Sequence, residues 1–381
     1  MGREDARIDS PARNTGDGAL TQRRKIEHIE ICMQENVQSR CGTMFEHIQF
    51  IHRSLPEVDR SSIDLTTNFL GLRANAPIMI AAMTGGHPQT YDVNRRLAEA
   101  AEELRIPIGV GSQRAAVEDK SLAYTFRVVR DSAPSVPVVA NIGATHIEFA
   151  QAAIDMIDAD VLAVHLNPLQ EAIQPEGDCN SVGVLDSIRE LRENVEIPII
   201  VKETGAGMSA SVARQLEEID IDAVDVGGVG GTSWAAVEYY RALREGDQVR
   251  AMLGEQYWDW GIPTALSVIT VREATDLPVI ATGGIRSGLD VAKALSLGAM
   301  VAGIALPLLK PAVTGETEDV IDVLNGMIEG LKTAMYLTGC ERVDDLQMQP
   351  LLLSPTLVTT LQALDIDFRK FTRGRRLHRL R

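Results

Sequence analysis

The chain has 381 residues, 45% of them hydrophobic and 4% aromatic, and its formal net charge is -16. Such acidity argues against general nucleic-acid binding, because a phosphate backbone would be repelled. No stretch approaches the roughly 20 consecutive apolar residues that a membrane helix requires, so no membrane span is expected. The length allows either one large barrel with extensions or two smaller domains.

Lysine is scarce, since only seven of the 37 basic residues are lysine. An acidic surface that is rich in arginine is what we expect of a halophile, although a skewed genome composition could produce the same bias. Four cysteines show no paired metal-ligand spacing: Cys32, Cys41, Cys179 and Cys340. Because the charged N-terminus shows no apolar signal segment, we expect reduced thiols and a cytoplasmic protein.

The two ends of the chain differ from its middle. Residues 1–20 are polar and lack periodicity, which predicts a disordered N-terminal extension. Residues 369–381 form a basic tail that we expect to be a solvated end. Between them, residues 21–368 are predicted to form a single domain. This domain opens with a cationic cluster around Arg24, Lys25 and His28, which is either a solvated helix start or a diphosphate clamp folded over a distant active site.

From Ile78 onward the chain repeats a short apolar strand, a glycine-bearing turn and an amphipathic segment of helix length. Eight such units predict a (β/α)8 TIM barrel, and a doubly wound sheet is the alternative. The insertion from Arg241 to Gly261, with Tyr257, Trp258 and Trp260, suggests a lid or an oligomer contact. The predicted strands are 78–83, 108–110, 138–141, 160–166, 198–203, 223–226, 279–282 and 300–303.

The carboxyl ends of the predicted strands carry glycines and single polar groups. Glycine loops after the seventh and eighth strands, at 283–286 and 303–306, are typical of a phosphate site, because bare backbone N–H groups can approach the phosphate oxygens. Lys202 ends the fifth strand, where its cation could face an anion or an electron-rich ring. A solvated loop lysine is the alternative.

Polar side chains also follow the fourth predicted strand. His165, Asn167, Gln170 and Glu171 lie at or just beyond its carboxyl end, where parallel α/β folds keep their chemistry. The set does not match a zinc site, whereas magnesium accepts one or two carboxylates together with ligand oxygens. A polar loop that caps its own backbone is the simpler explanation of the same residues.

Taken together, these loops closely resemble those of the FMN-dependent type 2 isopentenyl-diphosphate isomerases, in family order over most of residues 21–310. The HLNPLQE and QPEGD stretches are highly specific, while the glycine loops are shared by many flavin barrels. The matching stretches are Arg24 to His28, Met83 to Gly86, Gly111 to Arg114, His165 to Glu171, Gln174 to Asp178, Lys202 to Gly205, Gly230 to Trp234 and Gly283 to Arg286.

The resemblance implies conversion of isopentenyl diphosphate to dimethylallyl diphosphate in isoprenoid biosynthesis, with reduced FMN as acid/base and Mg²⁺ holding the diphosphate. It implies FMN contacts at Ala82, Met83, Thr84, Ser112, Asn141, Lys202, Thr232, Gly284, Ile285, Arg286, Ala305 and Leu306. It implies substrate contacts at Arg24, Lys25, His28, Ser112, Gln113, Arg114 and Gln170. His165, Asn167 and Gln170 would be catalytic, and Glu171 would bind the metal.

NADPH or another reductant would reduce the flavin, and the family suggests a homotetramer or homo-octamer. Two other functions share parts of the pattern. An FMN-dependent hydroxy-acid oxidase or a glutamate-synthase-like oxidoreductase would use the same phosphate loops, with His165 as base. A barrel that only binds a phosphorylated metabolite as a regulator is the non-enzymatic alternative.

Overall fold

A closed parallel barrel forms the centre of the molecule. The computed structural model describes residues 17–374, with side chains from Arg24 onward. Within this range eight strands close in the order β10-β11-β4-β5-β6-β7-β8-β9, which confirms the (β/α)8 prediction over the doubly wound sheet. The strands are β4 (Ile78–Ile80), β5 (Ile108–Gly109), β6 (Val138–Gly143), β7 (Val161–His165), β8 (Ile199–Lys202), β9 (Ala223–Asp225), β10 (Val279–Thr282) and β11 (Val301–Ile304).

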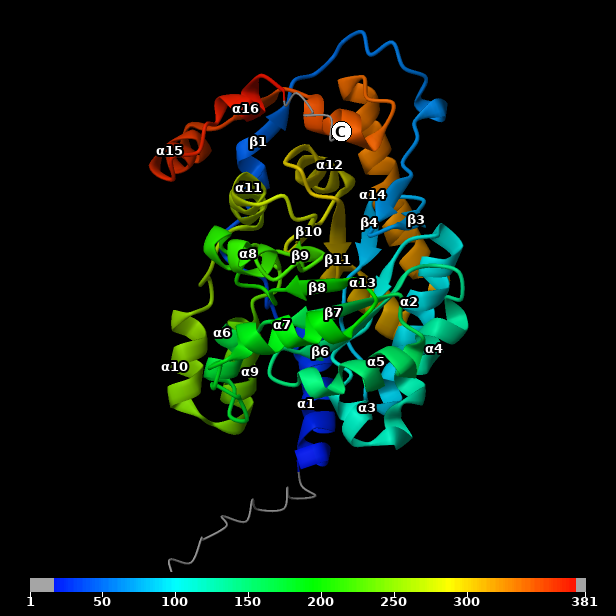
Figure 1. Ribbon diagram of the computed structural model, residues 1–381, viewed down its shortest axis with the longest axis vertical. Coiled ribbons are helices and arrows are strands. Elements are labelled where there is room, and N and C mark those ends of the chain that lie inside the picture. The colour runs from blue at the N-terminus through cyan, green and yellow to red at the C-terminus, as the bar shows by residue number, and fades with distance from the viewer. Residues whose placement is uncertain (1–16, 375–381) are drawn as a thin grey trace, which may run out of the picture.

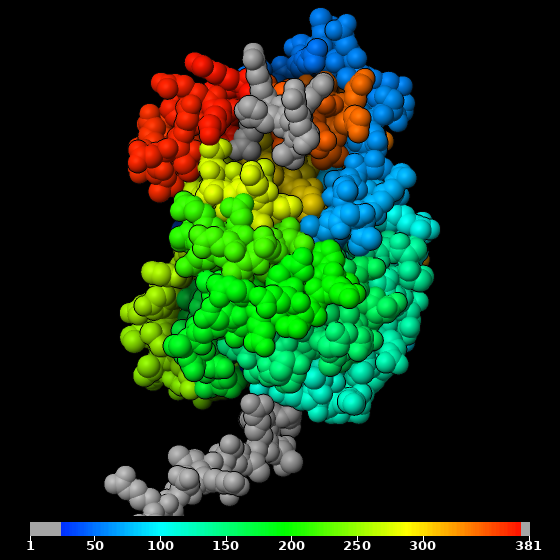
Figure 2. Space-filling model, in the orientation of Figure 1, coloured from blue at the N-terminus to red at the C-terminus, as the bar shows by residue number. Residues whose placement is uncertain are grey.

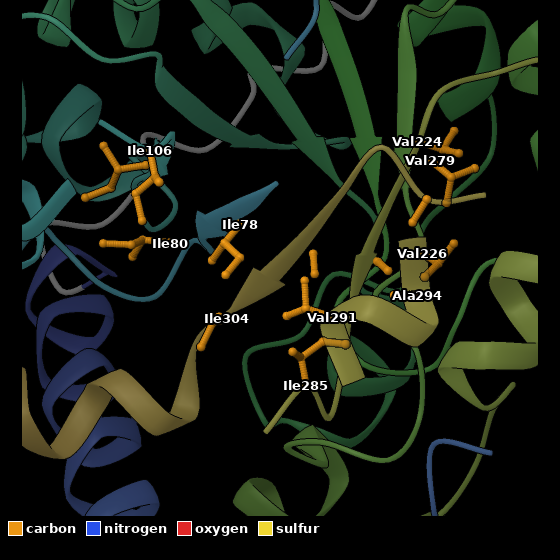
Figure 3. Close-up of a cluster of buried hydrophobic side chains, with 14 of the residues drawn as sticks. Ile78, Ile80, Ile106, Val224, Val226, Val279, Ile285, Val291, Ala294 and Ile304 are labelled. Carbon is orange, nitrogen blue, oxygen red and sulfur yellow. The ribbon is translucent and has the colours of Figure 1, made fainter. Parts of the chain in front are cut away.

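Helices surround the barrel because each has one apolar face. In α14 (Thr317–Thr338) the buried positions recur every three or four residues, as the helical period requires. Figure 3 shows Ile78 and Ile80 of β4 near Ile304 of β11, and Val291 and Ala294 of α12 (Gly288–Ser296) belong to the same apolar cluster. The other outer helices are α2 (Tyr91–Leu104), α4 (Tyr124–Ser132), α5 (Ala150–Ile157), α7 (Val184–Asn194), α8 (Ala210–Glu217), α11 (Thr264–Ala274) and α12 (Gly288–Ser296).

A hairpin closes the amino end of the barrel. Strands β2 (Thr67–Phe69) and β3 (Leu72–Ala74) are joined by Leu70 and Gly71, whose φ angles of 51° and 91° suit the tight turn of a two-residue hairpin. This turn presents Phe69, which is fully buried against side chains of the barrel interior such as Val161 and Ile280. The amino end is therefore filled, and only the carboxyl end is available for a site.

The two ends of the barrel are covered by different parts of the chain. Helix α1 (Asp17–Gln34) packs against α3 (Arg114–Glu118), α9 (Trp234–Glu245) and α13 (Leu306–Thr314) at the carboxyl end (Figure 1). The opposite end carries the small sheet of β1 (Ile48–Phe50) and β12 (Leu351–Leu353), together with α15 (Pro355–Ala363) and α16 (Arg369–Thr372). In Figure 2 the red C-terminal segment and the blue segment before β2 share that end.

The chain ends differ in part from the sequence prediction. Helix α1 begins at Asp17, inside the segment that we expected to be disordered. Within the expected basic tail, Arg369 to Thr372 are helical and Phe371 is 2% exposed, because its ring packs into the core. Residues 1–16 and 375–381 lie outside the described residues, so the rest of both predictions is untested.

The insertion after the sixth barrel strand is helical. Helix α9 runs to Glu245 and is followed by α10 (Gln248–Gln256). Trp258 is 6% exposed, packs on Tyr239 and Tyr240, and donates from Nε1 to the carbonyl of Gln38 at 3.0 Å. It therefore anchors the insertion to its own chain. A lid or oligomer role for the exposed Tyr257 and Trp260 stays a prediction.

No helix among residues 17–374 is long and apolar enough to span a membrane. Gly288 marks a close crossing of two helices, α12 and α14. A Cβ on Gly288 of α12 would lie 2.1 Å from the Met327 carbonyl oxygen of α14, whereas a Cβ on Gly326 of α14 meets nothing within 4 Å.

Replacing Gly288 with alanine should therefore destabilise the fold by about 1–3 kcal/mol, because the two helices must separate. The matched change Gly326→Ala should be neutral or stabilising by up to about 1 kcal/mol, since alanine is the better helix former. Urea unfolding of both variants measures the difference. Equal effects would show that the crossing is not tightly packed.

Candidate active site

Helix α1 brings the N-terminal cationic cluster to the barrel mouth. The Lys25 ammonium donates to the backbone carbonyl of Ser112, in the loop after β5, at 2.8 Å. Arg24 Nη1 lies 3.4 Å from Gln174 Oε1, beyond helix α6 (Pro168–Ile173). Residues more than 80 positions apart in sequence therefore meet at one end of the barrel. The clamp hypothesis fits this placement, whereas a freely solvated helix start does not.

A hydrogen-bonded chain then connects α1 to the predicted catalytic residues. His28 Nε2 lies 3.1 Å from Glu238 Oε1, in α9. The same Glu238 oxygen accepts from Gln170 Nε2 at 2.7 Å, and Gln170 Oε1 accepts from Asn167 Nδ2 at 2.8 Å. Because both ends of the Gln170 amide are engaged, its orientation is fixed.

The Glu238 carboxylate keeps its negative charge although it is buried. Although burial alone would raise the pKa of Glu238, hydrogen bonds from His28 and Gln170 and the charge of Arg241 lower it overall. Burial lowers the pKa of His28 despite its contact with Glu238. We therefore assign an ionised Glu238 and a neutral His28 that donates from Nε2. Arg241 Nη1 also contacts Glu176 at 2.8 Å, which ties the QPEGD stretch to the same network.

His165 is held as a neutral imidazole. Asn141 donates from Nδ2 to the Val110 carbonyl at 3.0 Å, so its Oδ1 is an acceptor and the 2.9 Å contact requires a proton on His165 Nδ1. Burial, helped by the charges of Lys202 and Lys25, lowers the pKa of His165 to about 3. At neutral pH its Nε2 is therefore a hydrogen-bond acceptor and not a general acid.

The predicted flavin residues meet around the mouth. Ala82, Asn141 and Lys202 line one cavity that opens from the barrel interior. The phosphate group of the predicted flavin fits a second set of features, at the start of α13 and in the glycine loops. Helix α13 starts after Ala305 with no side chain capping its N-terminus; Pro307 has no N–H and the Leu308 N–H donates to Ala305, so the Leu306 N–H is the first-turn donor left for an anion. A Cβ on Gly284 would lie 2.5 Å from the Gly230 carbonyl oxygen, so only glycine lets these two loops meet.

The remaining predicted flavin residues lie beside these features. Met83 and Thr84 follow β4, and the Thr84 carbonyl accepts from the Gly111 N–H next to Ser112. Thr232 lines a second hollow with Asn167 and Trp234. Ile285 is buried, while Arg286 is exposed and donates to Gln38 Oε1 at 3.1 Å. Leu306 begins α13. The arrangement fits an elongated ligand with a ring over the barrel and a phosphate at α13.

Two predicted diphosphate residues have protein partners. Gln113 is fully buried, donates to the Ala153 carbonyl at 2.8 Å and accepts from the Asn141 N–H at 2.9 Å, so its amide joins the barrel wall to α5. Arg114 pairs with Glu118 at 2.9 Å on the surface of α3. Contact of either side chain with a diphosphate stays a prediction.

Glu171 is the single carboxylate that sequence suggested for a metal. One of its oxygens accepts from the Asp178 N–H at 2.8 Å. No group of three or more His, Cys, Asp or Glu side chains suited to a metal lies within the described range. A magnesium ion here would take most of its oxygens from substrate and water, which is how Mg²⁺ commonly binds phosphorylated ligands. The residues thus fit a bridging cation better than a cage.

Glu238 and Arg241 were missed by the sequence reasoning. Both lie on α9, three residues apart, directly after the GGTSW loop at the end of β9. Their position in the sequence could have identified them, because a charged pair in the first turns of a helix at a barrel mouth faces the site. Composition alone gave no reason to separate them from other surface charges.

The class of protein follows from a match to a known family. The chain matches the FMN-dependent dehydrogenase family at residues 21–175 and 167–353. In structure it resembles lactate oxidase of Pediococcus acidilactici, with a TM-score of 0.64 and 16% identity over 92% of this chain and 96% of that one. A mandelate oxidase gives a TM-score of 0.59 and 16% identity over 89% and 98%. At such identity these oxidases share the fold alone.

Sequence relatives are much nearer. An isopentenyl-diphosphate delta-isomerase of Methanothermobacter thermautotrophicus is 50% identical over 350 residues, covering 92% of this chain and 98% of the relative. That of Thermococcus onnurineus is 49% identical over 371 residues, covering 94% and 98%. The chain belongs to the FMN-dependent dehydrogenase family and, within it, to the isopentenyl-diphosphate delta-isomerases.

Glu238 also supports the fold, which can be tested by unfolding. Glu238→Ala should lower the unfolding free energy by about 3 kcal/mol, because Arg241 loses a buried partner. The control Glu255→Ala removes an exposed ion pair with Arg40 and should barely change stability. If urea midpoints shift equally for both variants, the network around Glu238 is not a structural anchor.

Proposed function

We propose that the protein converts isopentenyl diphosphate to dimethylallyl diphosphate at the carboxyl end of its barrel, with reduced FMN and Mg²⁺. The observation that supports this best is the chain His28–Glu238–Gln170–Asn167, closed over the mouth by α1 with Lys25 and Arg24 beside it. This arrangement places two cations for a diphosphate, Lys25 and Arg24, beside the fixed amide of Gln170 and the buried carboxylate of Glu238. Relatives about 50% identical carry the name of this activity.

The reaction adds a proton to an unactivated alkene and removes another from the neighbouring carbon. The intermediate stage resembles a tertiary carbocation, so the site must exclude water and hold negative or π-rich density nearby. The ionised Glu238 and the ring of Trp234, which lies 5.1 Å from the His28 ring, are groups of that kind. Helix α1 would exclude water once the diphosphate is bound.

Gln170 is proposed to position or relay the second proton. Its amide lies between the Glu238 carboxylate and Asn167, so a proton arriving at the amide has an ionised acceptor 2.7 Å away. Neutral His165 would line the substrate pocket beside Asn167, with its Nε2 free to accept a hydrogen bond but not to donate one to the diphosphate. None of these residues needs to change its oxidation state.

Reduced FMN, when bound, would supply an electron-rich ring and an acid/base group without net redox change. Lys202 would face that ring from β8, while Arg286 and the α13 N-terminus would hold its phosphate. Glu171 would bind Mg²⁺ together with diphosphate oxygens. NADPH or another reductant would reduce the flavin. We further propose a cytoplasmic homotetramer or homo-octamer, from a halophile on the evidence of its acidic, lysine-poor composition.

The direct test is anaerobic incubation at high salt with isopentenyl diphosphate, Mg²⁺ and FMN, with and without dithionite. Dimethylallyl diphosphate should form only with dithionite, while the flavin spectrum stays reduced through many turnovers. Flavin reoxidised in proportion to consumed substrate would favour an oxidoreductase instead. Absence of both flavin binding and turnover would favour a regulatory barrel.

Gln170→Ala should lower turnover by about 10²–10⁴-fold, the usual contribution of a positioned acid or base. FMN affinity should change little, because Gln170 contacts Glu238 and Asn167 rather than the flavin cradle. The control is Gln151→Ala, at an exposed position of α5. Parallel losses of turnover and FMN affinity would sink the relay proposal.

Glu171→Gln should raise the Mg²⁺ concentration needed for half-maximal activity, since the amide lacks the carboxylate charge. The control Glu190→Gln removes an exposed carboxylate from α7 and should leave the titration unchanged. A magnesium titration of initial rates compares the two variants. An unaltered curve for Glu171→Gln would remove this residue as a ligand.

Diphosphate binding should weaken as the pH rises through neutrality. Burial and the neighbouring Arg24 lower the pKa of Lys25 to about 7, so the ammonium that binds the anion is lost above that pH in the free enzyme. The value of kcat/KM reports free-enzyme groups and should fall accordingly. Lys25→Arg keeps its charge and should flatten this limb; the same decline in both proteins would assign it to another group.

A further inference from the structure

A carboxylate lies inside the barrel among apolar side chains. Asp225 is the last residue of β9 and is 3% exposed. Met79, Val139 and Ile280 line the same cavity. Moving a carboxylate from water into such surroundings is costly unless it is hydrogen-bonded and paired with a cation. The position of Asp225 therefore requires a reason beyond packing.

The hydrogen bonds of Asp225 do not supply that reason. The Thr282 hydroxyl donates to Asp225 Oδ1, and the Gly227 N–H donates to the same oxygen at 3.2 Å. Both donors are neutral. The side-chain oxygen of an asparagine could accept both bonds in the same place. An ionisable carboxylate is thus an additional feature that the local hydrogen bonding does not need.

Lys202 is the cation that shares this cavity. It is the register partner of Asp225 on the neighbouring strand β8, and both side chains line the cavity together with Asn141. The Lys202 ammonium donates to the backbone carbonyl of Glu203 at 2.9 Å and makes no direct ion pair with Asp225, so the two charged groups interact across the cavity that they share. Burial raises the pKa of Asp225, and the charge of Lys202 opposes that rise.

The other carboxylate beside Lys202 is already engaged elsewhere. Burial raises the pKa of Glu203 to about 7, even though its Oε2 accepts three backbone N–H groups at 2.5–2.7 Å. Those donors belong to the loop after β8: Thr204, Gly205 and Ala206. Glu203 therefore holds the loop outside the strand, which leaves Asp225 as the carboxylate that faces Lys202 within the barrel.

We propose that Asp225 acts through Lys202: its carboxylate, in the same cavity, offsets part of the charge of the Lys202 ammonium at the barrel mouth. In this way it sets the relative affinity of the site for reduced and oxidised FMN. The inference rests on the proposed placement of Lys202 against the flavin ring. It adds a carboxylate whose charge would tune how electron-rich the cofactor is when bound.

The direction of the effect follows from charge. An anionic reduced flavin carries more negative charge than the oxidised form, so a cation at the ring favours the reduced form and an anion opposes it. Removing the Asp225 charge should expose the ring to the full field of Lys202. Removing Lys202 should have the opposite effect and should also remove most of the influence of Asp225.

The experiment is a double-mutant cycle on the FMN-loaded protein: Asp225→Asn, Lys202→Met and both together, with the flavin midpoint potential measured by anaerobic dye-coupled titration. Asp225→Asn should shift the affinity ratio about tenfold toward reduced FMN, which is about 30 mV upward for a two-electron couple. Lys202→Met should lower the potential. In the Lys202→Met background, Asp225→Asn should change the ratio by less than about threefold.

Asp222→Asn is the matched control, because Asp222 begins the same strand region at the opposite end of the barrel, where it accepts from the Ile199 N–H. It should leave the potential unchanged. If Asp225→Asn does not fold, Thr282→Val removes the donor to Asp225 and should shift the potential upward by a smaller amount.

An unchanged or lowered potential in Asp225→Asn, or an equal shift without Lys202, would overturn the inference. A Lys202→Met protein with an unchanged potential would instead overturn the proposed placement of Lys202.

Discussion

The ionised carboxylate of Glu238 is the interaction on which the site depends. It lies in the first turns of α9 and is bonded at once to His28, Gln170 and Arg241. A buried anion of this kind is costly unless hydrogen-bond donors and a positive charge compensate it. Because the neighbours come from α1, α6 and α9, satisfying one carboxylate fixes three separate segments at the barrel mouth.

The two ends of the barrel have different roles: the amino end is structural, and the carboxyl end carries the polar groups of the site. Its amino end is filled by Phe69 and covered by the segments around β1, β12 and α16. The carboxyl end retains polar groups, since each strand there ends in a loop whose backbone and side chains are free to contact a ligand. Two carboxylates of neighbouring strand ends illustrate the division: Glu203 holds a loop, whereas Asp225 faces the interior.

Much of this was predictable because it depends on local pattern. The eight strands were found within a few residues of their observed bounds, since continuous apolar runs between glycine and proline signals are typical of buried parallel strands. The loops with His165 and Lys202 were placed at strand ends for the same reason. The amphipathic α9–α10 segment was expected only as an insertion, because its burial depends on Trp258 finding Gln38 far along the chain.

Sequence by itself thus determined the fold class, the strand ends and the family, because each is written in short stretches of residues. Tertiary structure decided which charges act together. Glu238 and Asp225 are ordinary acidic residues in the sequence, and their pKa values depend on partners that folding brings from distant positions. Likewise Gln113, which sequence assigned to the ligand, is fixed to Ala153 because the barrel wall closes over it. Electrostatic roles follow from burial and distance, which no local pattern records.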